Sequence, residues 1–280
     1  MDKSSIDMTA IEMIKYLKFD RIWDCGLFKS KLKLHNTGKV ALVCIAKNED
    51  NYIQEWVDYH LKLGFDDIFI YQNNWRSNVV GNHVHLIPFD GEAKQLPSYN
   101  DFIQKNYLNY EWAAFIDVDE FIVLKKHCTI KDFIFDYQTF NCISVNWYFF
   151  GNNGHETIIE NNYNNIERFT KRASKMNKHI KTISKLSKNL NYVNAHYANC
   201  KWVDSHKKTG KGPYNKRYSD DIIQLNHYFC KTKEEFKHKV SKGLADQIGN
   251  LRPLTDYDRH NFNETDDFAA LVFKNNNVCK

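Results

Sequence analysis

Three carboxylates stand close together directly after an apolar stretch of the chain. Asp117, Asp119 and Glu120 follow the segment WAAFI at 112–116. Residues two apart in an extended segment point to the same side, so Asp117 and Asp119 would present their acids together. Paired acids with an open flank suit Mg²⁺ or Mn²⁺, which take few protein oxygens and complete their shells with substrate phosphates. The alternative is an acidic turn that only closes a strand.

Predicted strands and helices alternate along the chain, and these elements must position the acids. The run VALVCIA at 40–46 is typical of a strand buried on both faces. The next stretch places apolar residues at helical spacing, with Asn51 and Gln54 spaced as in a capping box and Gly64 as the stop. Further strands are predicted at 66–71, 83–89 and 112–116, and a further helix at 98–110.

This alternation of strands and helices predicts an α/β fold, a mainly parallel sheet with helices on both faces. Ligands of such sheets bind beyond the carboxyl ends of the strands. The polar cluster KNED at 47–50 follows the first strand, and DVDE at 117–120 follows the fourth. Both clusters are therefore expected at one edge of the sheet, which favours the metal site over the acidic turn.

The second half of the chain carries a weaker signal. A strand that runs into a Gly/Asn loop is expected over 142–156, and a helix over 231–249. The segment 160–218 is polar and basic, and its apolar residues follow no regular period. It is predicted to hold mobile loops that close over the donor or the acceptor. Without an internal repeat or a long linker, residues 1–280 are expected to form one domain.

Composition limits the classes of function. A net charge of +5 is compatible with anionic ligands but too weak to argue for nucleic acid. Seven scattered cysteines without a CxxC pair predict neither a disulfide framework nor a zinc site, and suit a reducing compartment. The N-terminus does not resemble a signal peptide, and no apolar run approaches the ~18 residues of a membrane span. We expect a soluble, cytoplasmic protein, with peripheral contact at the inner face of the membrane left open.

Five blocks of the sequence follow one another in a recognisable order. They are VALVCIAKNEDNYIQEWVDYHLKLGFDDIFIYQNN, YEWAAFIDVDEFIVL, NWYFFGNNGHE, ERFTKR and NHYFCKTKEEFKHKVSKG. This order resembles that of the family 92-like, family 2-related glycosyltransferases, over roughly 38–245. The resemblance implies the nucleotide-sugar-binding fold called GT-A, in which 38–125 would bind the nucleotide sugar and 126–280 would form the acceptor side.

The resemblance also implies roles for the acids and for the residues around them. Asp119 would ligate the metal directly, with Asp117 near the ribose or in the metal's water shell. The residues expected to bind the nucleotide sugar are Ala46, Lys47, Asn48, Glu49, Asn73, Gln95, Asp117 and Lys231. Many relatives carry an acidic residue after the second strand, where this chain reads YQNN at 71–74. An amide there can still hydrogen-bond a uracil edge.

Two histidines, each followed by a tyrosine, compete for the C-terminal metal-ligand role that the resemblance implies. His227 is preferred to His196 because Lys231 follows it four residues later. A neutral imidazole could complete the metal's shell while the ammonium meets a diphosphate oxygen. Together they would neutralise a UDP leaving group. The alternative for either histidine is a packed or surface position.

An inverting transfer needs a base to take the proton of the acceptor hydroxyl. The loop FGNNGHE ends a strand on the acceptor side and carries His155 and Glu156. Related enzymes place their base acid after a comparable loop, so Glu156 is the candidate base and a surface glutamate is the alternative. Arg168, Lys171 and Arg172 are candidates to grip phosphate or an anionic acceptor, although a solvated basic face is the default for such a run.

Residues and resemblance together predict a metal-dependent, inverting glycosyltransferase. It would move a hexose such as galactose from a UDP-sugar to a glycan or glycolipid acceptor in surface polysaccharide synthesis, with Mn²⁺ or Mg²⁺ as cofactor. Two other classes stay open. A non-catalytic carbohydrate-binding module would explain the aromatic content of 15% but not the strand-end acids. A metal-dependent phosphohydrolase or nuclease would normally need more carboxylates around two metals than one DVD motif supplies.

Overall fold

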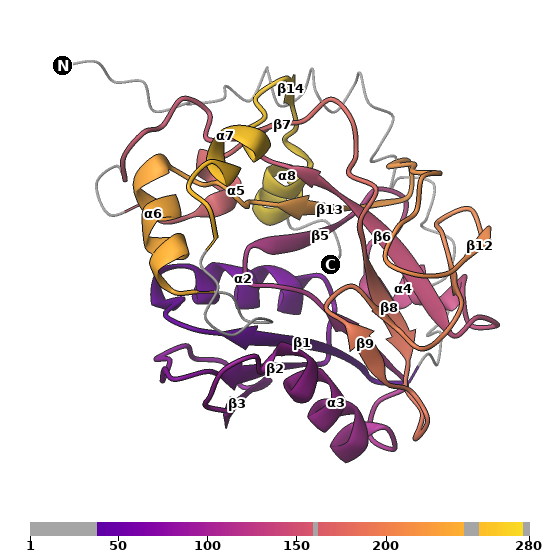
Figure 1. Ribbon diagram of the computed structural model, residues 1–280. Helices are drawn as coiled ribbons and strands as arrows, with labels where there is room; N and C mark the ends of the chain where they lie inside the picture. The colour runs from indigo at the N-terminus through magenta and orange to yellow at the C-terminus, as the bar shows by residue number, and fades with distance from the viewer. Residues whose placement is uncertain (1–37, 159–161, 244–251, 277–280) are drawn as a thin grey trace.

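The computed structural model describes residues 38–158, 162–243 and 252–276, and its framework is one large curved sheet (Figure 1). The first four strands along the chain are β1 (Val40–Ala46), β2 (Asp67–Gln72), β3 (Val84–Pro88) and β4 (Trp112–Phe115). β1 pairs in parallel with β2 and β4, and β2 pairs in parallel with β3. The predicted parallel sheet of an α/β fold is confirmed in this half of the chain.

The chain from Glu120 onward extends the sheet with mixed strand directions. Its main strands are β5 (Glu120–Leu124), β6 (Cys142–Phe149), β8 (Ile180–Lys185) and β13 (Ile223–His227). β8 lies between β4 and β6 and runs antiparallel to both. β13 pairs in parallel with β6 and antiparallel with β5, and His227 stands opposite Glu120 in that second pairing. The pairing brings His227 next to the segment that carries Asp119.

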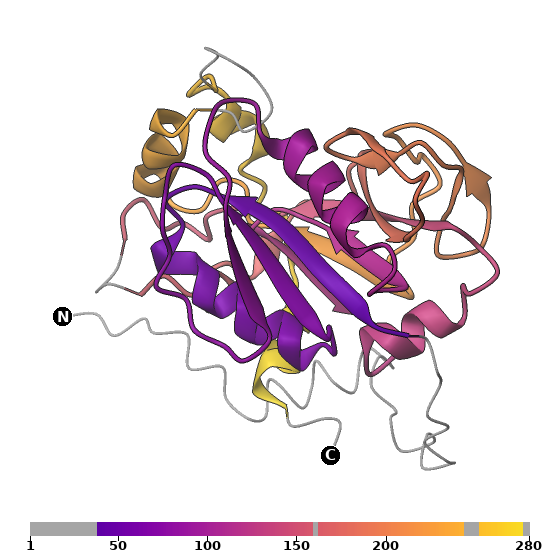
Figure 2. The ribbon, with the colours of Figure 1, turned by 90° about the horizontal axis from the view of Figure 1, so that it is seen from below.

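Helices cover both faces of the parallel strands, as predicted (Figures 1 and 2). The helices are α2 (Asp50–Lys62), α3 (Gln95–Asn106), α4 (Ile130–Phe135), α5 (Asn165–Arg168), α6 (Lys233–Ser241), α7 (Asp256–His260) and α8 (Ala269–Asn275). Successive residues of β1 point to opposite faces. Leu42 shares one core cluster with Trp56 of α2, whereas Val43 shares the other with Phe102 of α3. The two core layers thus fix the sheet from both sides.

Of the start and stop signals predicted for α2, only the stop is confirmed. Gly64 follows the helix with a left-handed φ of 99°, so the predicted stop is confirmed. The predicted capping box of Asn51 and Gln54 is wrong, because Glu49 is the N-cap residue and makes no side-chain cap bond. Gln54 instead donates to Asp58, one turn further along the same helix. Of the helix predicted over 231–249, α6 accounts for the first part, and 244–251 lie outside the described residues.

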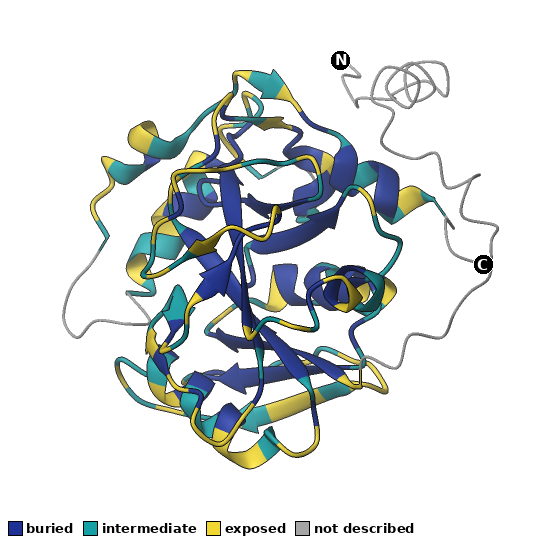
Figure 3. Cartoon of the chain, turned by 90° about the vertical axis from the view of Figure 1, so that its right-hand side faces the viewer, coloured by how far each residue is buried: buried dark blue, intermediate teal, exposed yellow. Residues whose placement is uncertain are grey.

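Short strands complete the described structure. They are β7 (Lys171–Arg172), β9 (Tyr192–Asn194), β10 (Tyr197–Ala198), β11 (Trp202–Val203), β12 (Thr209–Gly210) and β14 (Thr265–Asp266). Figure 3 shows the long strands buried at the centre and the exposed residues on the surrounding loops and helix surfaces. Within the described ranges, every helix is too short or too polar to cross a bilayer.

The prediction of loops over 160–218 is wrong for the middle of that segment, which forms a buried strand. This strand is β8, whose residues Ile180 to Ser184 are buried in the middle of the sheet. The sequence hides this strand because its buried positions are partly polar, and their partners are distant in the chain. Thr182, for example, bonds the hydroxyl of Tyr192 at 2.8 Å. A polar residue that is satisfied in this way packs like an apolar one, and no periodicity reveals it.

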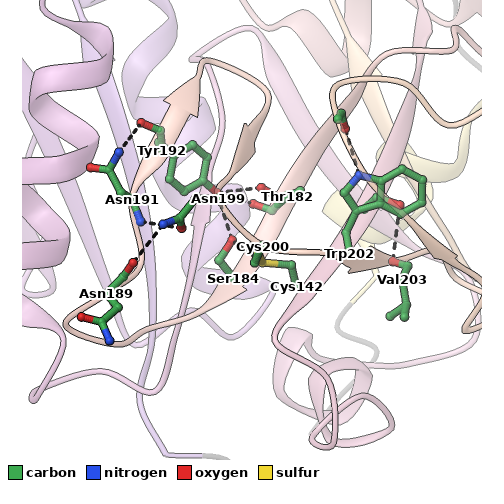
Figure 4. Close-up of a disulfide and its surroundings, with 12 residues drawn as sticks. Cys142, Thr182, Ser184, Asn189, Asn191, Tyr192, Asn199, Cys200, Trp202 and Val203 are labelled. Carbon is green, nitrogen blue, oxygen red and sulfur yellow. Dashed lines mark hydrogen bonds between the residues drawn. A yellow bond between two sulfur atoms is a disulfide. The ribbon is translucent and has the colours of Figure 1, made fainter.

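A disulfide joins Cys142 of β6 to Cys200, 58 residues later (Figure 4). The prediction of no disulfide framework therefore missed this bridge. β11 begins two residues after Cys200 and pairs with β6 one residue beyond Cys142. That pairing brings the two cysteines together, with their Cα atoms 6.7 Å apart. An odd number of scattered cysteines does not reveal a proximity that sheet topology creates.

Candidate functional site

A cleft of about 920 Å³ lies at the carboxyl ends of the parallel strands. Ala46 lines it from the end of β1, residues 47–49 just beyond that end, Asn73 beyond β2 and residues 117–120 beyond β4. His227 joins them from the end of β13. The structure thus gathers the two polar clusters of the sequence in one cleft, where parallel sheets place their ligands.

Asp117 is held between two side chains that the protein supplies. Gln95 of α3 donates to its Oδ1 at 2.9 Å, and Lys181 of β8 donates to its Oδ2 at 3.0 Å. The Lys181 side chain is only 3% exposed and also lies 3.4 Å from Glu120. Burial alone would lower the pKa of Lys181, but the carboxylates of Asp117 and Glu120 raise it well above its ordinary value. Lys181 therefore stays protonated at neutral pH, paired with Asp117 and Glu120.

Asp119 is more buried than Asp117 and faces two basic groups. Its Oδ2 lies 2.5 Å from Nζ of Lys239 on α6 and 3.6 Å from Nε2 of His227. Burial raises the pKa of Asp119, but Lys239, His227 and Lys231 outweigh that effect and hold it well below the usual range. Asp119 is therefore ionised at neutral pH.

Glu120 is fully buried and orders the loop between the two aspartates. Its Oε2 accepts the backbone N–H of Asp117 at 2.9 Å. Its Oε1 has no hydrogen-bond partner in the described part of the chain and lies 3.7 Å from Nδ1 of His227. Burial raises the pKa of Glu120, Lys181 opposes the rise, and the two aspartates add to it. The third acid of the motif is thus a structural support for Asp117.

The donor set at Asp119 fits a divalent cation that a diphosphate helps to hold. Burial lowers the pKa of His227, so its imidazole is neutral and can offer a lone pair beside the carboxylate. No group of three or more metal-ligating side chains occurs within the described ranges. Two protein ligands with phosphate and water oxygens in the remaining positions are usual for Mg²⁺ and Mn²⁺ at such sites.

The second candidate histidine, His196, lies in a different part of the same cleft. Its ring neighbours Trp147 and His179, with centroid distances of 5.6 and 5.4 Å. Burial, together with Lys181, lowers its pKa to about 4. Of the two histidines, only His227 contacts Asp119 in the described structure.

The segment at the end of β1 lines the cleft and meets the C-terminal end of α6. Asn48 adopts a left-handed backbone with φ of 52°, which turns the chain away from the strand. Lys47 donates to the Lys242 carbonyl at 3.1 Å, and Glu49 pairs with the Lys242 ammonium at 2.8 Å. Ala46 accepts the backbone N–H of Asn73 at 2.8 Å. These contacts tie the ends of β1 and β2 to the helix that supplies Lys239.

Asn73 and Lys231 also line the cleft, each in a constrained position. The Asn73 amide donates to the carbonyls of Phe89 and Gly91, so its nitrogen is used to fix the loop after β3. Lys231 has a left-handed φ of 51°, and its Nζ stands 3.2 Å above the ring of Tyr52. Burial lowers the pKa of Lys231 to about 8, against the opposing effects of nearby carboxylates.

Two other predicted functional groups lie away from the cleft. Glu156 is exposed and does not line the cleft, and His155 packs beside the ring of Phe169. Arg168 is not available to grip an anion, because it forms a buried two-pronged ion pair with Glu235. The functional residues that sequence reasoning missed are Lys181, Lys239 and Lys242, whose partners lie far away in the chain.

Arg172 and Lys171 are likewise engaged by the protein. Arg172 pairs with Asp267 at 2.7 Å and stacks on the ring of Tyr148. Lys171 lies on an exposed strand, 3.8 Å from Asp266. The basic run ERFTKR thus serves mainly to join the C-terminal segments to the sheet.

Comparison with known proteins shows which family the sequence matches. A family model described as glycosyltransferase family 92 matches residues 93–259, more than half of the chain. A glycosyltransferase family 92 protein of Ricinus communis is 28% identical over 110 residues, 35% of this chain and 19% of that protein. The chain therefore spans about a fifth of that curated relative.

A solved structure with a detectable overlap is that of 4-diphosphocytidyl-2C-methyl-D-erythritol synthase from Anaerococcus prevotii. The overlap covers 81% of this chain and 87% of that one, with 7% identity and a TM-score of 0.29. At that score the overlap supports no inference.

Proposed function

This chain belongs to glycosyltransferase family 92, and from that membership we propose that it transfers a sugar from a nucleotide-sugar donor to an acceptor hydroxyl. The observation that carries the proposal is the approach of Asp119 and His227 within the cleft, which Lys231 also lines. A carboxylate, a neutral imidazole and an ammonium in one place are suited to a diphosphate leaving group.

The proposed donor is a UDP-sugar that lies across the carboxyl ends of β1 and β2. Asn48, Asn73 and Gln95 give this part of the cleft uncharged polar groups, which suit a base edge and ribose hydroxyls. Asp117 is fixed by Gln95 and Lys181, so it is a pre-oriented acceptor for a ribose hydroxyl. Positioning of this kind costs little entropy when the donor binds.

The proposed cofactor is Mn²⁺ or Mg²⁺, with Asp119 and His227 as its protein ligands. When bound, the cation would neutralise the charge that develops on the departing diphosphate. Lys231 supports the same charge from the protein, because a pKa of about 8 leaves it mostly protonated at neutral pH. Its left-handed backbone and the Tyr52 ring fix the direction of the ammonium before the donor arrives.

The finer parts of the proposal rest on the family alone. They are inversion at the transferred sugar, a hexose such as galactose, a glycan or glycolipid acceptor, and surface polysaccharide synthesis in the cytoplasm as the setting. The acceptor would enter from the side of β6 and β8, because the β1 and β2 side is taken by the nucleotide.

Isothermal titration calorimetry with UDP, in the presence and absence of Mn²⁺, tests the proposal. Tight binding only when both are present supports the transferase. Indifference to the nucleotide would contradict it and favour a carbohydrate-binding module. A hydrolysis screen against UDP- and GDP-sugars with Mn²⁺ then identifies the donor, and release of a nucleoside monophosphate and sugar 1-phosphate instead of free sugar would point to a phosphohydrolase.

A further inference from the structure

The hairpin of β11 and β12 stands at one end of the large sheet and is rich in exposed basic side chains (Figure 1). Residues 201–218 hold six lysines and arginines and one acid, a net charge of +5, which equals that of the whole chain. All other residues of the chain therefore balance one another in charge. We call the exposed basic side chains of this segment the basic hairpin surface: Lys201, Lys207, Lys208, Lys211, Lys216 and Arg217.

Backbone contacts hold these side chains together in one folded unit. Lys201 and Lys211 flank the paired residues of β11 and β12, and both line a hollow of about 510 Å³. The Arg217 guanidinium donates to the Thr209 carbonyl at 2.9 Å, which fixes the loop after β12 against the hairpin. The position of the basic groups is thus set by the fold and not by a free loop.

The protein neutralises only a small part of this charge. Of the six side chains, only Arg217 has an ion-pair partner among the described residues, Asp204 at 3.3 Å. The next two acids along the chain, Asp220 and Asp221, are already paired with the two lysines that follow β5. Because exposed like charges repel one another, a surface of this kind favours an anionic partner.

Two exposed tyrosines in the same segment indicate what kind of anionic partner fits. Tyr214 is 47% exposed and Tyr218 is 43% exposed. Tyrosine is enriched where membrane meets water, because its ring is apolar and its hydroxyl is polar. A nucleic-acid strand needs ring faces that are open for stacking, but Nζ of Lys178 stands over the Tyr214 ring, 4.9 Å from its centroid. The tyrosines therefore favour a lipid surface over a nucleic acid.

The basic hairpin surface adjoins the cleft through Tyr214. The ring of Tyr214 meets that of His179 edge-on, with centroids 4.7 Å apart, and His179 lines the cleft. His179 directly precedes β8, on the side where the acceptor is proposed to enter. A bilayer in contact with this surface would therefore lie beside the acceptor side of the cleft.

We propose that the basic hairpin surface docks this protein on an anionic lipid bilayer. Its lysines and Arg217 contact lipid phosphates, and Tyr214 and Tyr218 lie at the level of the headgroups. Docking of this kind is peripheral and reversible, and it weakens as salt screens the charges. The inference does not depend on the proposed transferase function, although it would bring a glycolipid acceptor to the cleft.

Flotation of the full chain with lipid vesicles, without nucleotide or metal, tests the proposal. We expect binding at low salt to vesicles of phosphatidylcholine mixed with phosphatidylglycerol, and no binding to phosphatidylcholine alone. A variant with Lys201→Gln, Lys211→Gln and Lys216→Gln should bind the anionic vesicles roughly a hundredfold more weakly, about fivefold for each lysine. High salt should release the wild type from the same vesicles.

The matched control carries Lys39→Gln, Lys105→Gln and Lys237→Gln, which replace three exposed lysines of other elements. It loses the same net charge as the hairpin variant, so it should bind the anionic vesicles like wild type if position is what counts. Equal weakening in the two variants would show that only net charge matters and would overturn the assignment. Circular dichroism verifies that both variants are folded.

Two further outcomes would overturn the proposal. One is a wild type that stays unbound with anionic vesicles at low salt. The other is binding to a single-stranded oligonucleotide but not to vesicles, which would assign the surface to nucleic acid. UDP affinity is measured by calorimetry in separate samples without lipid, so a failure of docking is distinguished from a failure of the transferase proposal.

Discussion

Nζ of Lys239 lies 2.5 Å from Oδ2 of Asp119, the same oxygen that faces Nε2 of His227. The ammonium also donates a hydrogen bond to the Phe229 carbonyl at 3.0 Å, which helps to hold it in place. In this arrangement the protein supplies its own cation to the carboxylate that is proposed to bind a metal. Lys239 would therefore compete with the metal for Asp119 until a diphosphate offers the ammonium another partner.

Replacement of Lys239 should reveal this competition. Lys239→Met is expected to tighten the binding of Mn²⁺ in the absence of nucleotide by roughly tenfold, which corresponds to about 1.4 kcal/mol. Electron paramagnetic resonance of free Mn²⁺ measures the change without any turnover. Lys237→Met is the matched control, because Lys237 is exposed on the same helix. Identical Mn²⁺ affinity in the two variants would exclude competition.

Asp119→Asn tests the carboxylate itself. The substitution keeps the shape of the side chain but removes the charge, so Mn²⁺-dependent UDP binding and turnover should both be lost. The fold should persist, because the residue lies in a cleft at a strand end. Circular dichroism checks the fold and calorimetry the binding, with the exposed Asp258→Asn as control. An Asp119→Asn enzyme with full activity would refute the metal assignment.

Glu156→Gln should change kcat by less than about threefold, because Glu156 is exposed and lies outside the cleft lining. If Glu156 were the general base, kcat would fall by roughly 10²–10⁴. Steady-state kinetics with the donor found in the hydrolysis screen distinguishes these outcomes. A fall of that size with intact UDP affinity would restore the sequence-based assignment.

The buried pair of Arg168 and Glu235 should make stability depend on acidity. Burial would raise the pKa of Glu235, but Arg168 outweighs it and lowers the pKa from 4.5 to about 2. A depressed carboxyl pKa adds stability that is present above the unfolded value and lost as pH falls from 4.5 to about 2, roughly 3 kcal/mol in all. Urea unfolding across this range should show a steeper loss in wild type than in Glu235→Gln. Equal slopes would contradict the role of the pair.

The disulfide between Cys142 and Cys200 should contribute to stability. It closes a loop with a separation of 58 residues, and a bridge of that kind typically adds about 2–4 kcal/mol. Reduction with dithiothreitol should lower the free energy of unfolding by that amount. Cys200→Ala should be less stable from the start and should not respond to the reductant. A wild type insensitive to reduction would show that the bridge does not form in solution.

The sequence revealed those parts of the fold whose determinants are local. The run at 40–46 and the helical stripe after it define β1 and α2, because one short segment carries the whole pattern. β8 was hidden because Lys181 and Thr182 are buried against distant partners. Burial of such groups becomes visible only when the tertiary structure is known.

The candidate site likewise contains some residues that the sequence could predict and others that it could not. Asp117 and Asp119 follow a recognisable strand, and His227 was chosen through its spacing to Lys231, so these residues could be placed together in advance. Lys239 meets Asp119 across 120 positions of sequence. The sequence of α6 does not predict that contact, because the helix carries several lysines and nothing in the sequence distinguishes Lys239 from the others.

The register of the β5–β13 pairing also determines which side chain lies beside Asp119. His227 stands opposite Glu120, and Asn226 stands opposite Phe121. A slip of one residue would turn His227 to the other face and present Asn226 in its place, because neighbouring side chains on a strand point in opposite directions. A chain misassembled in this way could keep most of its hydrogen bonds and still lack the imidazole beside Asp119. The same backbone alignment thus decides both correct folding and the site proposed for the metal.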